Sequence, residues 1–156
     1  MAVFAPPAPE AEFRLLCAME PFDMRPVANA VTAQVGDMAL EFFELSHPYP
    51  VCGVRVACEG KVFTYTGDTV MCPGAATLAH GADLLLCDGS FIEVDRTEES
   101  SHMSAAQAAM LARDNGVKKL IITHRLAHYQ EGLHLSEAKA VFRNAYMARE
   151  MRSYLF

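Results

Sequence analysis

The apolar positions of the chain gather in short runs separated by turn residues. Residues 61–66 (Lys-Val-Phe-Thr-Tyr-Thr) combine β-branched and aromatic side chains, a composition typical of a buried strand. Residues 53–58 pair with them in a predicted hairpin, because Glu59-Gly60 suits a two-residue turn with positive φ. The continuous apolar runs Leu84–Cys87 and Leu120–Ile122 are typical of strands covered on both faces. These four segments predict the centre of a β-sheet.

Other segments predict the helices and the outer strands. Pro73 and Gly81 suit the start and the end of a short helix. Ser104, with Gln107 three residues later, is typical of a capping box that opens an alanine-rich helix. The remaining predictions are an irregular lead-in over residues 1–12, strands at about 13–18, 29–35, 38–45 and 119–123, and helices at about 73–80, 104–115 and 136–149. Strands followed by strand–helix alternation predict an α+β fold, a mixed β-sheet with helices packed on one face.

Size and composition are those of a single-domain globular protein. The 156 residues, 52% hydrophobic and 21% charged, suffice for one domain over residues 1–156 with a core of its own. No apolar run reaches the roughly 18–20 residues of a membrane span, and the first residues lack the basic start of a secretory signal. We therefore expect no membrane partner and a cytoplasmic location.

The cysteine pattern and the net charge argue against further classes of protein. The five cysteines are odd in number and form no Cys-x-x-Cys pair, which argues against a disulfide framework and a structural zinc knuckle. The net charge of −6 lacks the basic footprint of a general nucleic-acid binder. Residues 113–156 nevertheless carry 8 Lys/Arg against 4 Asp/Glu. This basic end is either a solvated helix face or a shallow positive rim suited to a phosphate-bearing substrate.

Three residues with metal-binding side chains follow predicted strands. His47 follows the segment at 38–45, Asp68 follows the segment at 61–66 after Gly67, and His124 ends Leu-Ile-Ile-Thr-His. Taken singly, each has a plainer interpretation, as a surface histidine before proline, a turn aspartate or a strand-end histidine. Together, two imidazoles and a carboxylate are a donor set for zinc that also admits manganese or iron. The sequence therefore predicts a metal site made by His47, Asp68 and His124.

The same residues carry a resemblance to a known family. The succession His-Pro, Gly-Val-Arg-Val and Tyr-Thr-Gly-Asp-Thr resembles the C-terminal half of the metallo-β-lactamase superfamily, and most closely its ribonuclease Z-like hydrolases. The likeness runs from about residue 3 to residue 150. It implies an αββα sandwich fold with two zinc ions, in which His47 and His124 each bind one ion and Asp68 bridges both.

The resemblance also suggests roles for two other residues. It implies that His102, two residues before Ser104, contacts the scissile phosphate and assists proton transfer, which makes His102 and Asp68 the candidate catalytic residues. The alternative is that His102 only braces the start of the helix. Asp88 stands where the family usually has glutamate, and we expect it to orient a ligating histidine. The other histidines (His80, His128 and His134) are expected to be solvated or to cap helices.

The chain also departs from the family. No His-x-His-x-Asp-His motif occurs, and the likeness covers only about half of the family's fold. We therefore expect a metal-dependent phosphodiesterase-like domain that is incomplete and inactive alone. The alternative is a non-catalytic, self-associating half-domain with weak or no metal binding. The expected partner is a second copy in a homodimer, sheet against sheet, or a missing N-terminal half.

The segment between His47 and Asp68 bears on the substrate. Only 20 residues separate the two, and the predicted hairpin uses them up. The long Gly/Pro-rich arm that transfer-RNA-processing members carry at this place is therefore absent. We expect a small-molecule or nucleotide phosphodiester substrate rather than tRNA.

Overall fold

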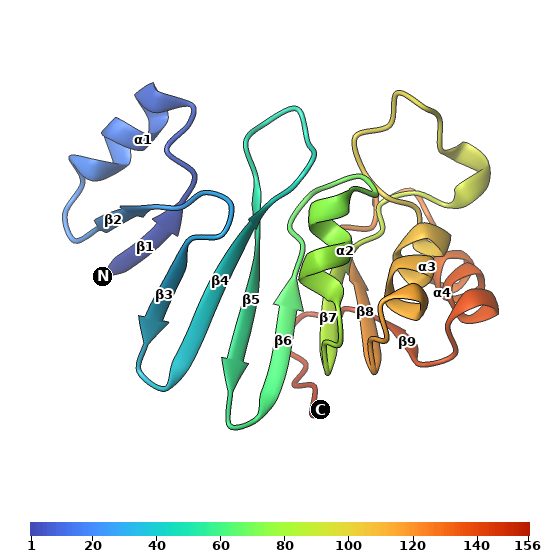
Figure 1. Ribbon diagram of the computed structural model, residues 1–156. Helices are drawn as coiled ribbons and strands as arrows, with labels where there is room; N and C mark the ends of the chain where they lie inside the picture. Colours follow the sequence, from blue (N-terminus) through green and yellow to red (C-terminus); the bar gives the residue numbers. More distant parts are fainter.

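A seven-stranded mixed sheet forms the centre of the molecule (Figure 1). The computed structural model describes residues 1–156. Neighbouring strands are antiparallel from β3 to β6 and parallel from β6 to β9. The strands follow one another across the sheet in chain order: β3 (Thr32–Val35), β4 (Met38–Glu44), β5 (Cys52–Cys58), β6 (Lys61–Tyr65), β7 (Leu84–Asp88), β8 (Lys119–Thr123) and β9 (Ala145–Met147).

Three helices cover one face of this sheet, as Figure 1 shows for α2, α3 and α4. They span Pro73–Ala79, Ala105–Asp114 and Glu131–Val141. Between helices and sheet lies a core of 20 buried apolar residues that includes Leu78, Leu85, Leu111, Leu120 and Ile122. The predicted α+β fold with helices on one face is confirmed. None of the helices combines the length and hydropathy that crossing a bilayer requires.

Local sequence signals placed the central elements correctly. The hairpin of β5 and β6 turns at Glu59 and Gly60, whose φ angles are 51° and 73°, as the two-residue turn requires. The capping box of α3 is present: the Ser104 hydroxyl accepts a bond of 3.0 Å from the Gln107 amide, and the Gln107 side chain accepts one of 3.2 Å from the Ser104 amide. Pro73 opens α2 as predicted.

The prediction for the first 18 residues was wrong. Residues 13–17 belong to helix α1 (Glu10–Cys17), and the lead-in contains β1 (Ala2–Ala5), which pairs in parallel with β2 (Asp23–Pro26) in a small second sheet. The largely apolar segment Phe-Arg-Leu-Leu-Cys was mistaken for a strand. No residue of α1 is buried. The first turn of the helix carries two glutamates, and their negative charges are stabilised by the positive end of the helix dipole.

The end of the chain also differs from the prediction. The last helix, α4, begins at Glu131 rather than Ser136 and ends at Val141, and residues 145–147 form strand β9 instead of continuing the helix. Strand β9 pairs with β8 in parallel, with Ala145 opposite Leu120 and Met147 opposite Ile122. Strand pairing with a distant segment therefore overrides the local helix propensity.

The side of the sheet away from the helices, here called the second face, is also apolar. The strand register places on it Leu40, Phe42, Val54, Val56, Phe63, Tyr65, Leu84, Leu86, Ile121 and Tyr146. The chain's own ends cover part of it: Phe4 stacks on Phe42 at 5.6 Å between ring centroids, and Phe156 lies 6.5 Å from Phe63. In Figure 1 the C-terminal tail crosses behind the sheet.

Candidate metal centre

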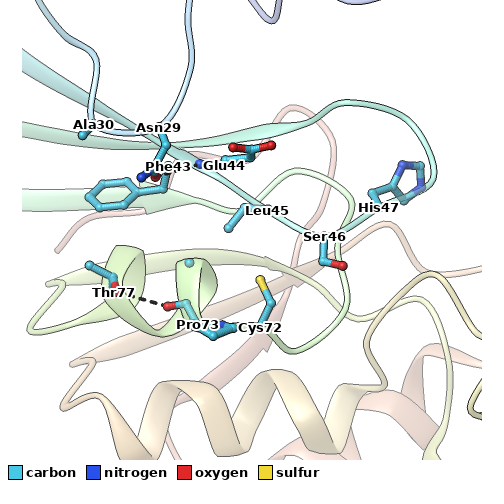
Figure 2. A pocket seen from close by; sticks show the side chains of 11 residues that line it. Asn29, Ala30, Phe43, Glu44, Leu45, Ser46, His47, Cys72, Pro73 and Thr77 are labelled. Atoms are coloured by element: carbon cyan, nitrogen blue, oxygen red, sulfur yellow. Dashed lines mark hydrogen bonds between the residues drawn. The ribbon is translucent and has the colours of Figure 1, made fainter.

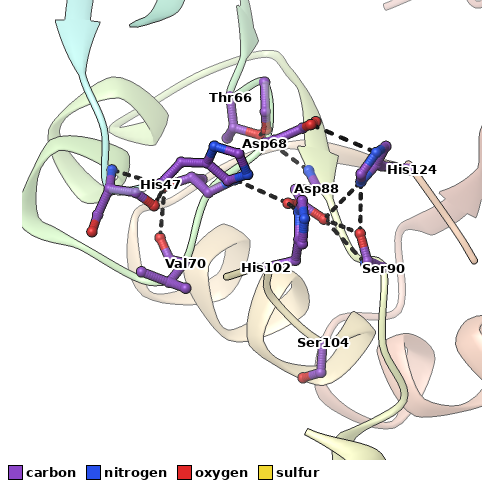
Figure 3. Close-up of polar contacts among 12 residues, drawn as sticks. His47, Thr66, Asp68, Val70, Asp88, Ser90, His102, Ser104 and His124 are labelled. Atoms are coloured by element: carbon purple, nitrogen blue, oxygen red, sulfur yellow. Dashed lines mark hydrogen bonds and ion pairs between the residues drawn. The ribbon is translucent and has the colours of Figure 1, made fainter. Parts of the chain in front are cut away.

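Polar side chains converge where the parallel strands end. Asp68 follows β6, Asp88 ends β7 and His124 follows β8, so these residues meet at one edge of the sheet. His102 reaches the same point from the loop before α3. One ligand atom of each of these four residues lies within 4.8 Å of those of the other three. Figure 3 shows the group from close by. The edge thus unites residues separated by up to 56 positions in the chain.

His47 lies beside this group but outside it. It comes from the loop after β4, which runs in the same direction as β6 because β5 is antiparallel to both. The centroid of its ring is 5.2 Å from that of His102. Its Nδ1 accepts a 3.2 Å hydrogen bond from the Tyr49 amide, which leaves Nε2 without a partner in the chain. The assignment of His47 as a metal ligand stays a prediction.

Asp88 is the buried anchor of the group. Its side chain is inaccessible to solvent, and its Oδ2 accepts bonds from the Thr69 amide (2.9 Å) and from His102 Nδ1 (2.7 Å). Its Oδ1 accepts bonds from the amide (3.1 Å) and the hydroxyl (2.7 Å) of Ser90. Four donors occupy the four lone-pair directions of a carboxylate. Asp88 therefore orients its neighbours and has no oxygen lone pair left for a metal ion.

Asp68 and His124 are open to solvent and face each other. Oδ2 of Asp68 lies 3.6 Å from Nε2 of His124, and 39% and 43% of the two side chains are exposed. The atoms of the group of four that remain free to bind a metal ion are therefore an Asp68 oxygen and the Nε2 atoms of His102 and His124. Imidazole and carboxylate donors in this number suit one tetrahedral zinc ion and admit manganese or iron. The residues present thus fit one divalent metal ion.

Thr69, a residue that the sequence analysis passed over, ties two loops of the site together. Its hydroxyl accepts a 3.2 Å bond from the Ser46 amide, and the Val70 amide donates to the Ser46 carbonyl at 3.1 Å. The loop that carries His47 is thereby fixed to the loop that carries Asp68. The threonine directly after Asp68 was the available signal, since a hydroxyl in a turn readily bonds to nearby backbone.

The cysteines stay outside the group of four. Cys72, four residues past Asp68, has its Sγ 3.9 Å from the Thr69 hydroxyl and is half-buried. Burial raises the pKa of the Cys87 thiol strongly, and the nearby Asp88 charge adds to the effect. Cys87 is therefore a neutral thiol in the core rather than a thiolate ligand.

Two recesses flank the candidate centre. A groove of about 730 Å³ beside His47, shown in Figure 2, lies between the end of β4 and the start of α2. Glu44 and Asn29 line it, together with Cys72. A recess of about 440 Å³ beside His124 is lined by Arg125 and Arg149 among others.

The remaining histidines differ from one another in environment. His80 and His128 are exposed, as expected, but His134 is fully buried in α4 and donates from Nε2 to the Ser90 carbonyl at 3.2 Å. Its Nδ1 has no hydrogen-bond partner. The expectation that His134 is solvated was wrong because α4 begins five residues earlier than predicted and carries His134 into the core.

Comparison with known proteins agrees with this architecture. A family model described as "Beta-lactamase superfamily domain" matches residues 6–125. Ribonuclease Z of Methanosarcina acetivorans is 36% identical over 96 residues, which are 59% of this chain and 32% of that protein. The chain belongs to the metallo-β-lactamase superfamily and is similar to its ribonuclease Z-like members. It spans between 31% and 45% of the length of these curated relatives.

Solved structures share the fold. The metallo-beta-lactamase fold protein YhfI from Bacillus subtilis superposes with a TM-score of 0.87 at 20% identity, over 95% of this chain and 62% of that one. Zinc-bound PqqB from Methylobacterium extorquens superposes with a TM-score of 0.72 at 17% identity, over 95% and 60%. At these identities the likeness extends to the fold alone.

Proposed function

We propose that the chain is the metal-binding half of a phosphodiesterase-like hydrolase. The observation that carries the proposal is the convergence of Asp68, His102 and His124 within 4.8 Å at the edge where the parallel strands end. Loops at this edge are where sheet proteins of this kind build active sites. A bound divalent ion would supply a water molecule of lowered pKa and a Lewis acid for the phosphoryl oxygen.

The chain's own residues have distinct roles in this proposal. An Asp68 oxygen and Nε2 of His124 would hold the ion. His47 would join them after its ring gives up the hydrogen bond from the Tyr49 amide, because a neutral imidazole that accepts at Nδ1 carries its proton on Nε2. His102 is fixed through Nδ1 by Asp88 at 2.7 Å, so its Nε2 points toward the open side of the site. In the protonated form, Nε2 can give a proton to the departing oxygen, as a histidine acting as general acid does.

The two recesses favour a small substrate with one phosphodiester group. Arg125 and Arg149 line the recess beside His124 together with Glu131 and Glu150. Arg149 is paired with Glu131 at 2.8 Å, so Arg125 is the cation that would meet a single phosphate there. Glu44 at the groove beside His47 disfavours a second phosphate there, and with Asn29 it suits a neutral group that donates hydrogen bonds, such as a sugar hydroxyl. A nucleotide or small-molecule diester fits these charges better than tRNA, because the β5–β6 hairpin fills the segment between His47 and Asp68.

The proposal includes a partner for the chain and a cellular location. We propose that a second copy of the chain covers the second face, and that full activity requires such a partner. Five free cysteines without a disulfide favour a reducing compartment such as the cytoplasm. The non-catalytic half-domain remains the second candidate, since one metal site offers fewer ligands than a catalytic metal pair needs.

Metal binding and hydrolysis test the proposal together. Chelator competition on the purified chain is expected to give weak zinc binding, and Asp68→Ala is expected to weaken it at least tenfold because it removes the only free carboxylate. His80→Ala, an exposed histidine distant from the site in the fold, is the matched control. Bis(p-nitrophenyl) phosphate with zinc or manganese reports hydrolysis.

Each result has a defined meaning. No zinc binding by the wild-type chain, or equal binding by Asp68→Ala, would contradict the metal centre. Zinc binding without hydrolysis in any oligomeric state would favour the non-catalytic half-domain. Zinc-dependent hydrolysis that Asp68→Ala abolishes and His80→Ala retains supports the enzyme.

A further inference from the structure

Ser90 is a buried hydroxyl residue placed between an anchor and a candidate ligand. It lies two residues past Asp88, in the loop that follows β7, and is fully buried. Its hydroxyl oxygen is 2.7 Å from Oδ1 of Asp88 and 2.8 Å from Nδ1 of His124. Figure 3 shows Ser90 between these two side chains. No other side chain of the chain hydrogen-bonds to His124.

The directions of these hydrogen bonds follow from counting protons. A hydroxyl has one proton to donate, whereas an ionised carboxylate can only accept. The Ser90 proton is therefore directed to Asp88, and the hydroxyl oxygen must accept from His124. His124 then carries its proton on Nδ1, and in the neutral imidazole the lone pair lies on Nε2, which faces Asp68 at 3.6 Å.

We propose that Ser90 is a positioning residue that fixes His124 in the Nδ1-protonated tautomer and thereby prepares Nε2 to bind the metal ion. The inference rests on the metal centre proposed above. Hydrogen-bonded partners that set the tautomer and the orientation of a ligating histidine strengthen metal affinity. Without Ser90 the nearest acceptor for His124 Nδ1 is Asp88 Oδ1, which lies 3.9 Å away, beyond hydrogen-bond distance.

The surroundings of Ser90 hold its hydroxyl in place. His134 donates to its carbonyl at 3.2 Å, and its own amide donates to Asp88 at 3.1 Å. A side chain on the preceding Gly89 would approach the Ile122 side chain within 2.5 Å, so the loop packs directly on β8. The backbone of Ser90 is thus fixed on both sides, and its hydroxyl has little freedom to turn away from His124.

The experiment compares Ser90→Ala and Ser90→Thr with the wild-type chain. The first readout is the tautomer of His124 in the metal-free protein, from long-range ¹H–¹⁵N correlation spectra of ¹⁵N-histidine-labelled protein at a pH of about 8, where imidazole is neutral. The His124 signals are assigned by their loss in His124→Asn. The second readout is the zinc Kd from chelator competition. Ser101→Ala removes a hydroxyl beside His102 that makes no hydrogen bond, and serves as the control.

The expected result is a wild-type His124 protonated on Nδ1 and a mixture of tautomers in Ser90→Ala. The zinc Kd of Ser90→Ala is expected to rise about 10–100-fold, with Ser90→Thr and Ser101→Ala near the wild type. An unchanged tautomer in a folded Ser90→Ala protein, or a wild-type His124 protonated on Nε2, would overturn the inference. Since the tautomer readout needs neither metal nor substrate, a failure of the hydrolase proposal would leave it standing.

Discussion

Two histidines on either side of Ser90 illustrate how individual residues are constrained near the site. His124 has a φ of 60°, in the left-handed region that a non-glycine residue enters at a cost of roughly 1–2 kcal/mol. The turn ends β8 and directs the imidazole toward Asp68. His134, on the other side of Ser90, is fully buried with an unpartnered Nδ1. The backbone strain thus lies at the candidate centre, and the buried polar atom lies behind it, in the helix that bonds to the Ser90 carbonyl.

His134 should make stability depend on pH. Burial lowers the pKa of His134, and the positive charge of Arg125 adds to this effect, so the folded state keeps the ring neutral below the unfolded pKa of about 6.5. Below that pH the unfolded chain binds the additional proton, and the wild type loses stability as pH falls. Replacing His134 by glutamine removes this contribution. The stability difference between wild type and His134→Gln is therefore expected to be largest above pH 6.5 and to shrink toward pH 5.

Urea unfolding across this pH range measures the effect. His80→Gln, at an exposed histidine, is the matched control and should leave the pH profile unchanged. A difference between wild type and His134→Gln that grows as pH falls would contradict the expected sign.

At the scale of elements, two glycines show how closely helix α2 approaches the sheet. A Cβ on Gly74, in the first turn of α2, would lie 2.3 Å from the carbonyl oxygen of Glu44 at the end of β4. A Cβ on Gly53 in β5 would lie 2.7 Å from the Leu78 side chain of α2. The absence of side chains at both positions lets α2 lie directly on β4 and β5. The groove beside His47 is bordered by this contact.

Replacing a helical glycine by alanine should therefore change the free energy of unfolding in opposite directions at Gly74 and Gly132. Gly74→Ala is expected to lower the free energy of unfolding by about 1–3 kcal/mol, because backbone rather than a flexible side chain must move. Gly132→Ala in α4, where nothing lies within 4 Å of the new methyl group, is expected to raise it by about 0.5–1 kcal/mol. Thermal or urea unfolding gives both values. A Gly74→Ala protein as stable as the wild type would mean that α2 moves away without cost.

At the scale of the whole molecule, the two faces of the sheet are covered unequally. Helices cover one face, whereas the second face is covered only by chain ends, and Tyr65 and Tyr146 on it remain 36% and 43% exposed. Monomers rarely expose a contiguous apolar patch larger than a few hundred Å². A twofold pairing of identical sheets is the simplest way to cover it.

We therefore predict a homodimer of twice the 17.1 kDa chain, measured by light scattering after size exclusion. Tyr65→Lys places a charge in the second face and is expected to give a folded monomer. Val94→Lys, at an apolar residue that is 82% exposed outside the second face, is the control and should remain dimeric. A wild-type particle of one chain that binds no hydrophobic dye would show that the chain ends alone suffice.

The sequence by itself determined the elements whose signals are local. The hairpin follows from Glu59-Gly60, the start of α3 from Ser104 and Gln107, and the central strands from their β-branched and apolar runs. The parallel order of β6, β7 and β8 then brings Asp68, Asp88 and His124 to one edge, so three of the group of four could be expected from strand ends. Turn residues, helix caps and the pattern of apolar and polar residues each depend on only a few neighbouring positions. A single sequence therefore contains all the information needed to predict them.

Tertiary structure alone decided what depends on distant segments. Strand β9 forms where β8 pairs with it. Residues 13–17, none of which is buried, lie in helix α1 outside both sheets. The burial of His134 depends on where α4 packs, and the bond between Ser90 and His124 joins residues 34 positions apart. These features arise from pairing and packing between elements, for which the local sequence carries no signal.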